Sequence, residues 1–236
     1  MTEQFLRSEM LLGQPAMERL YRAHVAVLGL GGVGSWCAEA LARAGIGQLT
    51  LVDDDTIAMS NLNRQVEALH STLGQPKADA MAARIRDINP HCRLSPLILR
   101  YTAETREDFF SRGYDYIIDA IDTVSAKLDL IETALTRGIP IISAMGTGNK
   151  LNPSLFRMTD IAKTEGCPLA RVMRKELKAR GISHHKVVFS PELPQKPEER
   201  EAPAPGRRSV PASAAWVPPV AGFLLAGEVV QNLIAE

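Results

Sequence analysis

Three groups of residues in this 236-residue sequence have the types and spacing needed to hold a phosphorylated nucleotide. The first is a glycine loop, Gly29–Gly34, with glycines at 29, 31, 32 and 34 directly after an apolar run. Asp53 and Asp55 end a second apolar run, at the roughly 20-residue distance where an acid holds a ribose. Arg64 and Lys77 follow, and their charges suit a triphosphate, whereas a plain dinucleotide-binding domain has no use for them.

The glycine loop can bind phosphate only if a strand precedes it and a helix follows it. Residues 24–28 are apolar and β-branched, which predicts a buried parallel strand, and residues 36–44 have apolar positions at helical spacing before Gly45. Glycine lets phosphates approach bare backbone, and the first helical N–H groups attract their negative charge. The context that the motif requires is therefore present.

The remaining patterns predict an α/β fold with a Rossmann-like, doubly wound, mostly parallel sheet. Ligands of such sheets lie over the carboxyl ends of the strands. We expect short helices around Pro15 over 9–22, further strands at 49–55, 93–99, 114–122 and 139–143, helices at 77–89 and 105–112, and a loop at 146–149. Asp122 would then lie beside the glycine loop. It could hold magnesium, or Asp122 or Thr123 could simply cap the next helix.

Composition limits the function classes. Lys+Arg and Asp+Glu both number 27, so attraction to nucleic acid must be local. The three cysteines, Cys37, Cys92 and Cys167, are too far apart for a paired Cys-x-x-Cys zinc site, and their odd number in a chain with a polar amino terminus favours a reducing cytoplasm. The longest apolar stretch, 217–225, contains two prolines and is too short to span a bilayer, so we expect no membrane partner.

One domain over 1–236 is expected, with a nucleotide-binding core at 24–150 and a substrate segment at 151–190. Cys167-Pro168 precedes an amphipathic helix in that segment, and its basic residues are Arg171, Arg174, Lys175 and Lys178. Residues 163–186 carry a net charge of +5, which suits an RNA, although a solvated helix face is the ordinary explanation. Residues 191–213 contain six prolines and predict a poorly ordered loop, and 214–236 predict a helix that is core or dimer interface.

Several motifs together resemble the adenylating superfamily of the ubiquitin-activating enzymes and the bacterial activators of sulfur carriers. They run through nearly the whole chain: Arg7 to Gly13, the glycine loop, Ser60 to Arg64, Gly74 to Lys77, Asp119 to Asp122, Cys167 to Arg171, and Val217 to Gly222. Within the superfamily, the likeness is greatest to the enzymes that dehydrate threonylcarbamoyladenosine in tRNA. The resemblance implies ATP and Mg²⁺ as cofactors, no zinc, tRNA as partner, and a cytoplasmic homodimer.

The resemblance also assigns roles. Backbone groups around Gly29, Gly31, Gly32 and Gly34, with Asn61, Arg64 and Lys77, would hold ATP; Asp53 or Asp55 would hold its ribose, Asp122 its magnesium, and Arg7 would reach the nucleotide of the partner subunit. Arg64, Lys77 and Asp122 would be catalytic, and Cys167 could accept a thioester. The substrate carboxylate would be adenylated and then attacked by its own ureido nitrogen, with net loss of water.

Two alternatives remain. One is an activator of a ubiquitin-like sulfur carrier's terminal glycine, for which a sulfur-carrier or cysteine desulfurase system would be the partner. The missing zinc cysteines, the basic segment and Thr123, where such activators tend to have Asn, disfavour it. The other is an oxidoreductase or a non-catalytic dinucleotide-binding module, which leaves Arg64 and Lys77 without a role.

Overall fold

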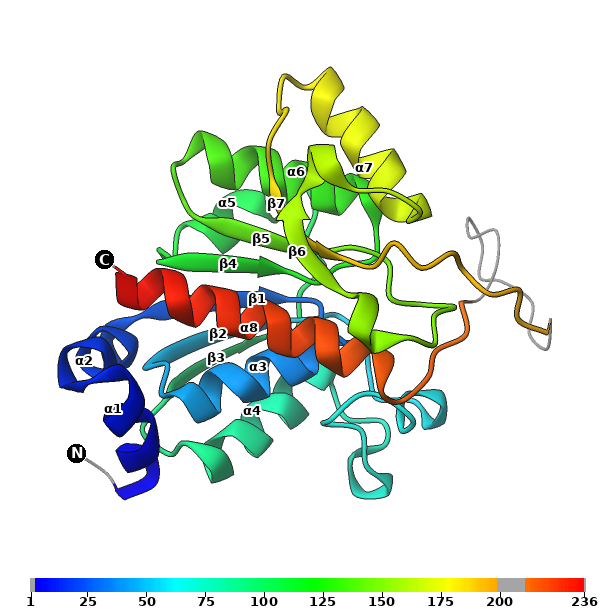
Figure 1. Cartoon of the computed structure of the whole chain (residues 1–236). Helices are drawn as coiled ribbons and strands as arrows, with labels where there is room; N and C mark the ends of the chain where they lie inside the picture. Colours follow the sequence, from blue (N-terminus) through cyan, green and yellow to red (C-terminus); the bar gives the residue numbers. More distant parts are fainter. Residues whose placement is uncertain (1–2, 199–210, 236) are drawn as a thin grey trace.

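A computed structural model describes residues 3–198 and 211–235 of the chain. Figure 1 shows one sheet with helices on both faces. Its seven strands lie in the order β3-β2-β1-β4-β5-β7-β6. They are β1 (His24–Leu28), β2 (Gln48–Val52), β3 (Arg93–Leu97), β4 (Tyr116–Asp119), β5 (Ile141–Ala144), β6 (Arg157–Asp160) and β7 (Lys186–Phe189).

The helices alternate with the strands through the first two thirds of the chain. They are α1 (Leu6–Leu12), α2 (Gln14–Arg22), α3 (Gly34–Ala44), α4 (Lys77–Ile88), α5 (Arg106–Phe110), α6 (Val124–Thr136), α7 (Pro168–Ala179) and α8 (Val217–Ala235). Short 3-10 turns occupy η1 (Glu3–Phe5), η2 (Met59–Asn61), η3 (His70–Thr72), η4 (Pro153–Leu155) and η5 (Ile161–Lys163).

The strand order reverses at β1, which lies between β2 and β4. Both neighbours are parallel to β1, with Leu28 opposite Val52 on one side and Asp119 on the other. The carboxyl ends of β2, β1, β4 and β5 therefore meet at one edge of the sheet, at the switch point where doubly wound folds bind ligands. The predicted α/β, Rossmann-like fold is confirmed, and only β6 runs antiparallel, against β7.

Two apolar cores lie on opposite faces of the sheet. Side chains of α2, α3, α4 and α8 form one core, and side chains of α5, α6 and α7 form the other. Helix α8 lies along α3, where a Cβ on Gly222 would be 2.4 Å from the Val33 carbonyl oxygen. Although α8 is long and apolar enough to span a membrane, its buried side chains make it a helix of the core.

Element boundaries differ from the prediction at several places. β4 ends at Asp119 rather than residue 122, since its partner β1 turns away at the glycine loop. Helix α8 begins at Val217, because Pro218 and Pro219 occupy its first turn, where a missing N–H costs nothing. Strands β6 and β7 were not predicted. The predicted loop 191–213 has neither helix nor strand at 191–198 and 211–213, and its residues 199–210 lie outside those described.

Candidate active site

A cavity of about 1730 Å³ lies over the carboxyl ends of the central strands. Its walls come from the glycine loop, the end of β2, the 61–65 turn, the loops after β3, β4 and β5, helix α7 and residues 211–213. The predicted residues that line it are Gly29, Gly31, Gly32, Asp53, Asp55, Asn61, Arg64, Lys77, Asp122 and Cys167. Residues distant in the sequence are thus gathered at one place.

The glycines of the loop meet different physical demands. Gly29 has φ +84°, and a Cβ there would lie 2.7 Å from the Ala120 carbonyl oxygen. A Cβ on Gly34 would lie 1.8 Å from the Gly29 carbonyl oxygen, so this glycine allows strand and helix to approach closely. A Cβ on Gly31 would have only the Gln65 side-chain amide within 4 Å. Gly31 borders the cavity. Gly34 itself is buried behind the cavity wall.

Asp53 links the glycine loop to β2. Its carboxylate accepts hydrogen bonds from the backbone N–H of Leu30 at 2.6 Å and of Asp55 at 2.9 Å. The buried Lys77 ammonium lies 2.8 Å from Asp55 Oδ2 and 3.9 Å from Asp53 Oδ1. Burial raises the pKa of Asp53, and Lys77 and the two N–H groups oppose this shift. Two carboxylates and one ammonium group therefore lie together, and these are the side chains that the sequence analysis expected to bind the ribose and the phosphates.

Hydrogen bonds hold both the side chain and the backbone of Arg64. Its Nη1 donates to the carbonyl oxygen of Ser60 and to Asn63 Oδ1, each at 2.8 Å, and its own carbonyl oxygen accepts from Trp36 Nε1 at 2.9 Å. Burial lowers the pKa of the guanidinium. Asn61 Oδ1 accepts from the Ala58 N–H at 2.9 Å, so this amide shapes the turn that presents Arg64.

Glu67 is a charged residue of this region that the sequence analysis missed. Its side chain is only 1% exposed, and burial raises the pKa of the carboxyl to about 7. The charges of Lys77 and Asp53 act on it in opposite directions. A single glutamate in a turn carries no sequence signal of burial, because its depth depends on the later packing of α3 and α4.

Asp122 lies in the loop between β4 and α6, exposed on the cavity wall. Helix α6 begins at Val124 with Thr123 as its N-cap residue, and the Thr123 side chain makes no capping hydrogen bond. Thr123 Oγ1 instead donates to Asp122 Oδ1 at 3.3 Å. The structure thus gives no support to Thr123 as a side-chain cap.

The β5 end of the cavity is formed by Gly146–Lys150, Cys167 and residues 211–213. Cys167 is 3% exposed, precedes α7, and lies with its Sγ 3.5 Å from the position of a Cβ on Gly146. Lys150 is buried, and its ammonium donates to the carbonyl oxygens of Ser190 and Glu192. This end carries fewer charges than the β2 end.

Helix α7 has three different faces. Val172 and Glu176 face the cavity, whereas Met173 and Leu177 are in the core. Of the four predicted RNA-binding residues, Arg171, Lys175 and Lys178 are exposed on the third face, four and three residues apart. Arg174, the fourth, differs from them: it is half-buried, and its guanidinium donates to the Thr164 carbonyl and hydroxyl oxygens.

Arg7 lies on α1, and Figure 1 shows α1 at the end of the sheet opposite the carboxyl ends of the strands. It does not line the cavity of its own chain. Among the described residues, Asp53, Asp54 and Asp55 form the group whose oxygens are close enough together, within 4.8 Å, to share a metal ion. Lys77 already pairs with two of these carboxylates, so it competes with a cation there.

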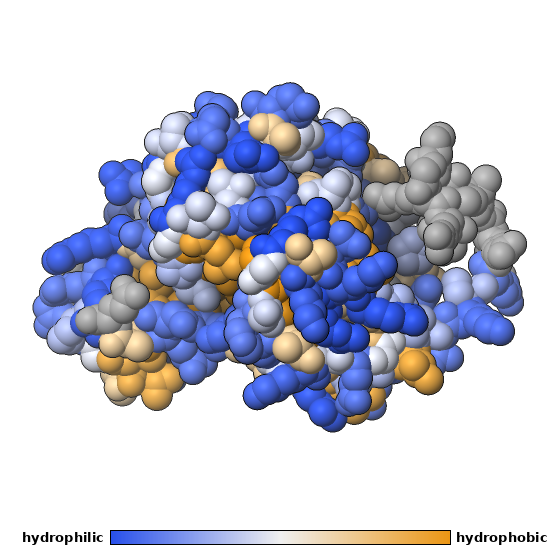
Figure 2. Space-filling view, turned by 90° about the horizontal axis from the view of Figure 1, so that it is seen from above, coloured by the Kyte–Doolittle hydropathy of each residue, from blue (hydrophilic) through white to orange (hydrophobic). Residues whose placement is uncertain are grey.

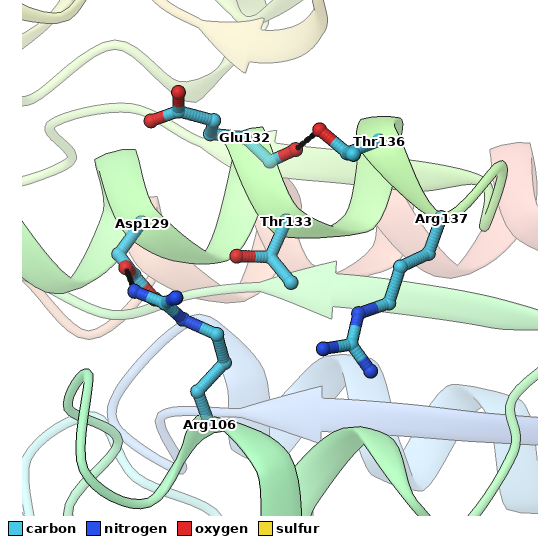
Figure 3. Close-up of a pocket in the computed structure, with 6 residues that line it drawn as sticks. All are labelled: Arg106, Asp129, Glu132, Thr133, Thr136 and Arg137. Atoms are coloured by element: carbon cyan, nitrogen blue, oxygen red, sulfur yellow. Dashed lines mark hydrogen bonds and ion pairs between the residues drawn. The ribbon is translucent and has the colours of Figure 1, made fainter.

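A smaller cavity of about 410 Å³ borders α5 and α6 (Figure 3). The Arg106 guanidinium donates to Asp129 there, with Nε 3.0 Å from Oδ2, and Thr136 donates to the Glu132 carbonyl oxygen. Arg137 pairs with Glu107 and the Glu132 carboxylate with Arg180, both outside the lining. None of the predicted site residues lines this cavity.

Comparison with known proteins identifies the family. Residues 5–236 match the ThiF family. The tRNA threonylcarbamoyladenosine dehydratase of Bacillus subtilis (strain 168) is 46% identical over 245 residues, which cover 100% of this chain and 96% of the relative. A crystal structure of the E. coli tRNA N6-threonylcarbamoyladenosine dehydratase in complex with ATP is 36% identical, with a TM-score of 0.89, and the match covers 99% of this chain and 94% of that one.

An adenylyltransferase matches a smaller part of the chain. The molybdopterin-synthase adenylyltransferase of Salmonella typhimurium is 38% identical over 126 residues, covering 53% of this chain and 50% of the relative. The superfamily resemblance inferred from the motifs is confirmed, and the likeness to the dehydratases extends over the full length. The chain belongs to the ThiF family.

Proposed function

We propose that this chain is an enzyme that uses ATP to dehydrate N6-threonylcarbamoyladenosine in tRNA to its cyclic form. The observation that carries the proposal is the full-length match to the dehydratases, together with a cavity that gathers the glycine loop, Arg64, Lys77 and Asp122. The cavity volume of about 1730 Å³ exceeds the roughly 300–1,000 Å³ of an ordinary small-molecule site, so it leaves room for a second substrate beside a nucleotide.

The chain's own groups would act mainly by positioning and charge neutralisation. Backbone N–H groups at Gly31 and Gly32 would cradle phosphates, Arg64 and Lys77 would hold phosphate oxygens, and Asp53 or Asp55 would hold the ribose. The substrate carboxylate attacks the α-phosphorus and pyrophosphate leaves. The ureido nitrogen then attacks the acyl adenylate, AMP leaves, and the nitrogen gives its proton to solvent.

Magnesium fits the oxygen donors of this site. Asp122 presents a hard carboxylate to the cavity, and such oxygens are the ligands that Mg²⁺ takes together with phosphates. When bound, the ion would supply charge neutralisation on the triphosphate. Cys167 borders the same cavity, and a thioester on its sulfur is not needed for the cyclisation, so we assign it no obligatory step.

The RNA would contact the exposed basic face of α7. Figure 2, seen from above the view of Figure 1, shows hydrophilic residues over much of this side of the molecule. Arg171, Lys175 and Lys178 are exposed on α7. Phosphate contacts from such residues supply sequence-independent affinity. We further propose that the enzyme is a cytoplasmic homodimer in which Arg7 of each subunit serves its partner's nucleotide.

A parallel turnover assay tests the function. The protein with ATP and Mg²⁺ is given tRNA bearing threonylcarbamoyladenosine, the same tRNA without the modification, and a sulfur-carrier protein with a terminal glycine. We expect turnover and the cyclic nucleoside, seen by mass spectrometry as a loss of water, only with the modified tRNA. Adenylation of the carrier with no dehydrated nucleoside would contradict the proposal.

A further inference from the structure

Asn149, in the loop after β5, has a backbone conformation that asparagine adopts less readily than glycine. Its φ of +58° is the only positive value outside glycine among residues 3–198 and 211–235. Left-handed backbone costs non-glycine residues energy and persists where the surrounding contacts over-determine it. The contacts that do so here are long-range.

Asn149 binds two segments that are far apart in the sequence. Its N–H donates to the Ala212 carbonyl oxygen at 2.8 Å, and its Oδ1 accepts from the Ala212 N–H at 2.7 Å. Its own carbonyl oxygen accepts from the Gln195 N–H at 2.7 Å. The left-handed turn lets all three groups act at once, so this residue brings positions 195 and 212 to the same place.

The segment that Asn149 holds, residues 211–216, forms one wall of the large cavity. Pro211, Ala212 and Ser213 line it, and a Cβ on Gly148 would be 2.9 Å from Pro211 Cβ. Two further bonds fasten this segment: Asn63 Nδ2 to the Ser213 carbonyl oxygen at 3.0 Å, and Trp216 Nε1 to the Leu151 carbonyl oxygen at 2.9 Å.

The same wall continues into the nucleotide side of the cavity. Segment 211–216 leads directly into α8, whose Pro218 would be 3.0 Å from a Cβ on Gly32. The glycine loop lies at β1, and Asp53 and Asp55, the acids that would hold the ribose, lie at the end of β2, so a bound nucleotide would extend from β1 toward β3. The β5 end, on the other side of Asp122, is left for the carboxylate that attacks the α-phosphorus.

We propose that Asn149 is a positioning residue that sets the wall 211–216 and thereby orients the modified nucleoside toward the nucleotide. This inference rests on the proposed function. Asn149 Oδ1 is the atom on which this role depends, because it accepts the hydrogen bond from the Ala212 N–H. The other two hydrogen bonds are made by the Asn149 backbone, so any substitution that keeps the turn also keeps them.

Three variants separate the side chain from the turn. Asn149→Gly keeps the left-handed turn and removes Oδ1, Asn149→Asp keeps an acceptor oxygen, and Asn152→Ala is the matched control. Asn152 Oδ1 accepts from the nearby Ser154 N–H at 3.0 Å, and Asn152 does not line the cavity. Each protein is measured for its KM for modified tRNA, its ATP affinity, its Tm, and hydrogen exchange in peptides covering 211–216.

For Asn149→Gly we expect faster exchange over 211–216 and a KM for tRNA raised roughly tenfold, the size of one lost hydrogen bond. Its ATP affinity and Tm should stay near wild type, and Asn149→Asp and Asn152→Ala should match wild type throughout. An unchanged tRNA KM in Asn149→Gly, failure of Asn149→Asp to restore it, or a parallel loss of ATP affinity and Tm would overturn the proposal. A wild-type protein that does not turn over tRNA would refute the proposed function instead, and the exchange data would still judge Asn149.

Discussion

The Asp53 carboxylate accepts hydrogen bonds from the backbone N–H groups of Leu30, in the glycine loop, and of Asp55. Its Oδ1 lies 3.9 Å from Lys77 Nζ. One carboxylate thus fixes the loop that approaches phosphate and the cation that would bind it. Arg64 is fixed in a similar way by Ser60, Asn63 and Trp36. Groups held before the ligand arrives need little reorganisation during the reaction, and this gives preorganised charge its catalytic value.

Asp122 can be tested as a magnesium ligand at the level of a single atom. Asp122→Asn keeps the shape and removes the charge that holds a hard cation, so turnover should fall by orders of magnitude. Tm should change little. Asp87→Asn serves as the control, because Asp87 is exposed on α4 and does not line the cavity, and it should leave both rate and stability near wild type. Nearly full activity in Asp122→Asn would place the site elsewhere.

Glu67 predicts a pH dependence of stability. Burial raises the pKa of its carboxyl from 4.5 to about 7 in the folded state, so the folded protein binds more protons than the unfolded one between these values. The unfolding free energy therefore falls as pH rises through this window, by at most about 3 kcal/mol from this group. Glu67→Gln should lack this loss, as measured by urea unfolding from pH 5 to 9.

The comparison of Glu67→Gln with wild type isolates this group. Burial also lowers the pKa of His185, to about 4, so His185 reduces stability as pH falls, and this contribution cancels in the difference. Exposed Glu18 on α2 provides the matched control, and Glu18→Gln should follow the wild-type curve. Identical pH curves for Glu67→Gln and wild type would mean that the Glu67 carboxyl titrates normally.

At the scale of elements, the strand, turn and helix around the glycine loop predict a contrast between two glycines. Gly34→Ala forces a Cβ to 1.8 Å from the Gly29 carbonyl oxygen, so it should destabilise the fold strongly, by about 3 kcal/mol or more. Gly31→Ala has open space and should keep its Tm while ATP affinity falls. Thermal unfolding and ATP titration of both variants check this, and equal Tm losses would contradict it.

Helix α7 predicts a salt-dependent interaction. Arg171→Ala, Lys175→Ala and Lys178→Ala together should weaken tRNA binding and flatten its dependence on salt, because fewer counterions are released, and ATP binding should be unaffected. The control removes three exposed arginines elsewhere, Arg22, Arg86 and Arg112. If both triple variants lose the same affinity, the α7 face has no special role and is merely solvated.

The sequence predicted the helices, strands and turns that are marked by local patterns. The features that it did not predict depend on contacts between residues far apart in the sequence. The glycine loop, the end of α3 before Gly45 and the placement of Arg64 and Lys77 at the cavity follow from neighbouring residues. The end of β4 depends on where β1 turns. β6 and β7 are no shorter than β4 and β5, but β6 reads Arg-Met-Thr-Asp without an apolar run, and the three apolar residues of β7 follow a basic, histidine-containing stretch. The bonds from Asn149 to Ala212 cross 63 residues, so no window of sequence contains them.

At the scale of the whole molecule, α1, the helix that carries Arg7, lies at the end of the sheet opposite the carboxyl ends of the strands (Figure 1). The cavity lies over those carboxyl ends, so the proposed role of Arg7 requires a second subunit. The helix that carries Arg7 also exposes Leu6, Met10 and Leu11, at 51%, 79% and 84%. An apolar stripe of this kind on a short helix is suited to cover by a partner. Two-fold symmetry would then give each subunit's Arg7 to the other's site.

Mixing two defective variants tests this exchange. Arg7→Ala and Lys77→Ala should each be nearly inactive as pure proteins. A heterodimer contains one site with both an intact Lys77 and an intact Arg7 from the other subunit. Random reassortment of an equal mixture should therefore recover about a quarter of wild-type turnover, because half of the dimers are mixed and each has one working site. The recovery should disappear on dilution below the dimer's dissociation constant, as followed by sedimentation. Subunits that exchange without any recovered turnover, or a fully active monomer, would show that Arg7 does not act on a partner's nucleotide.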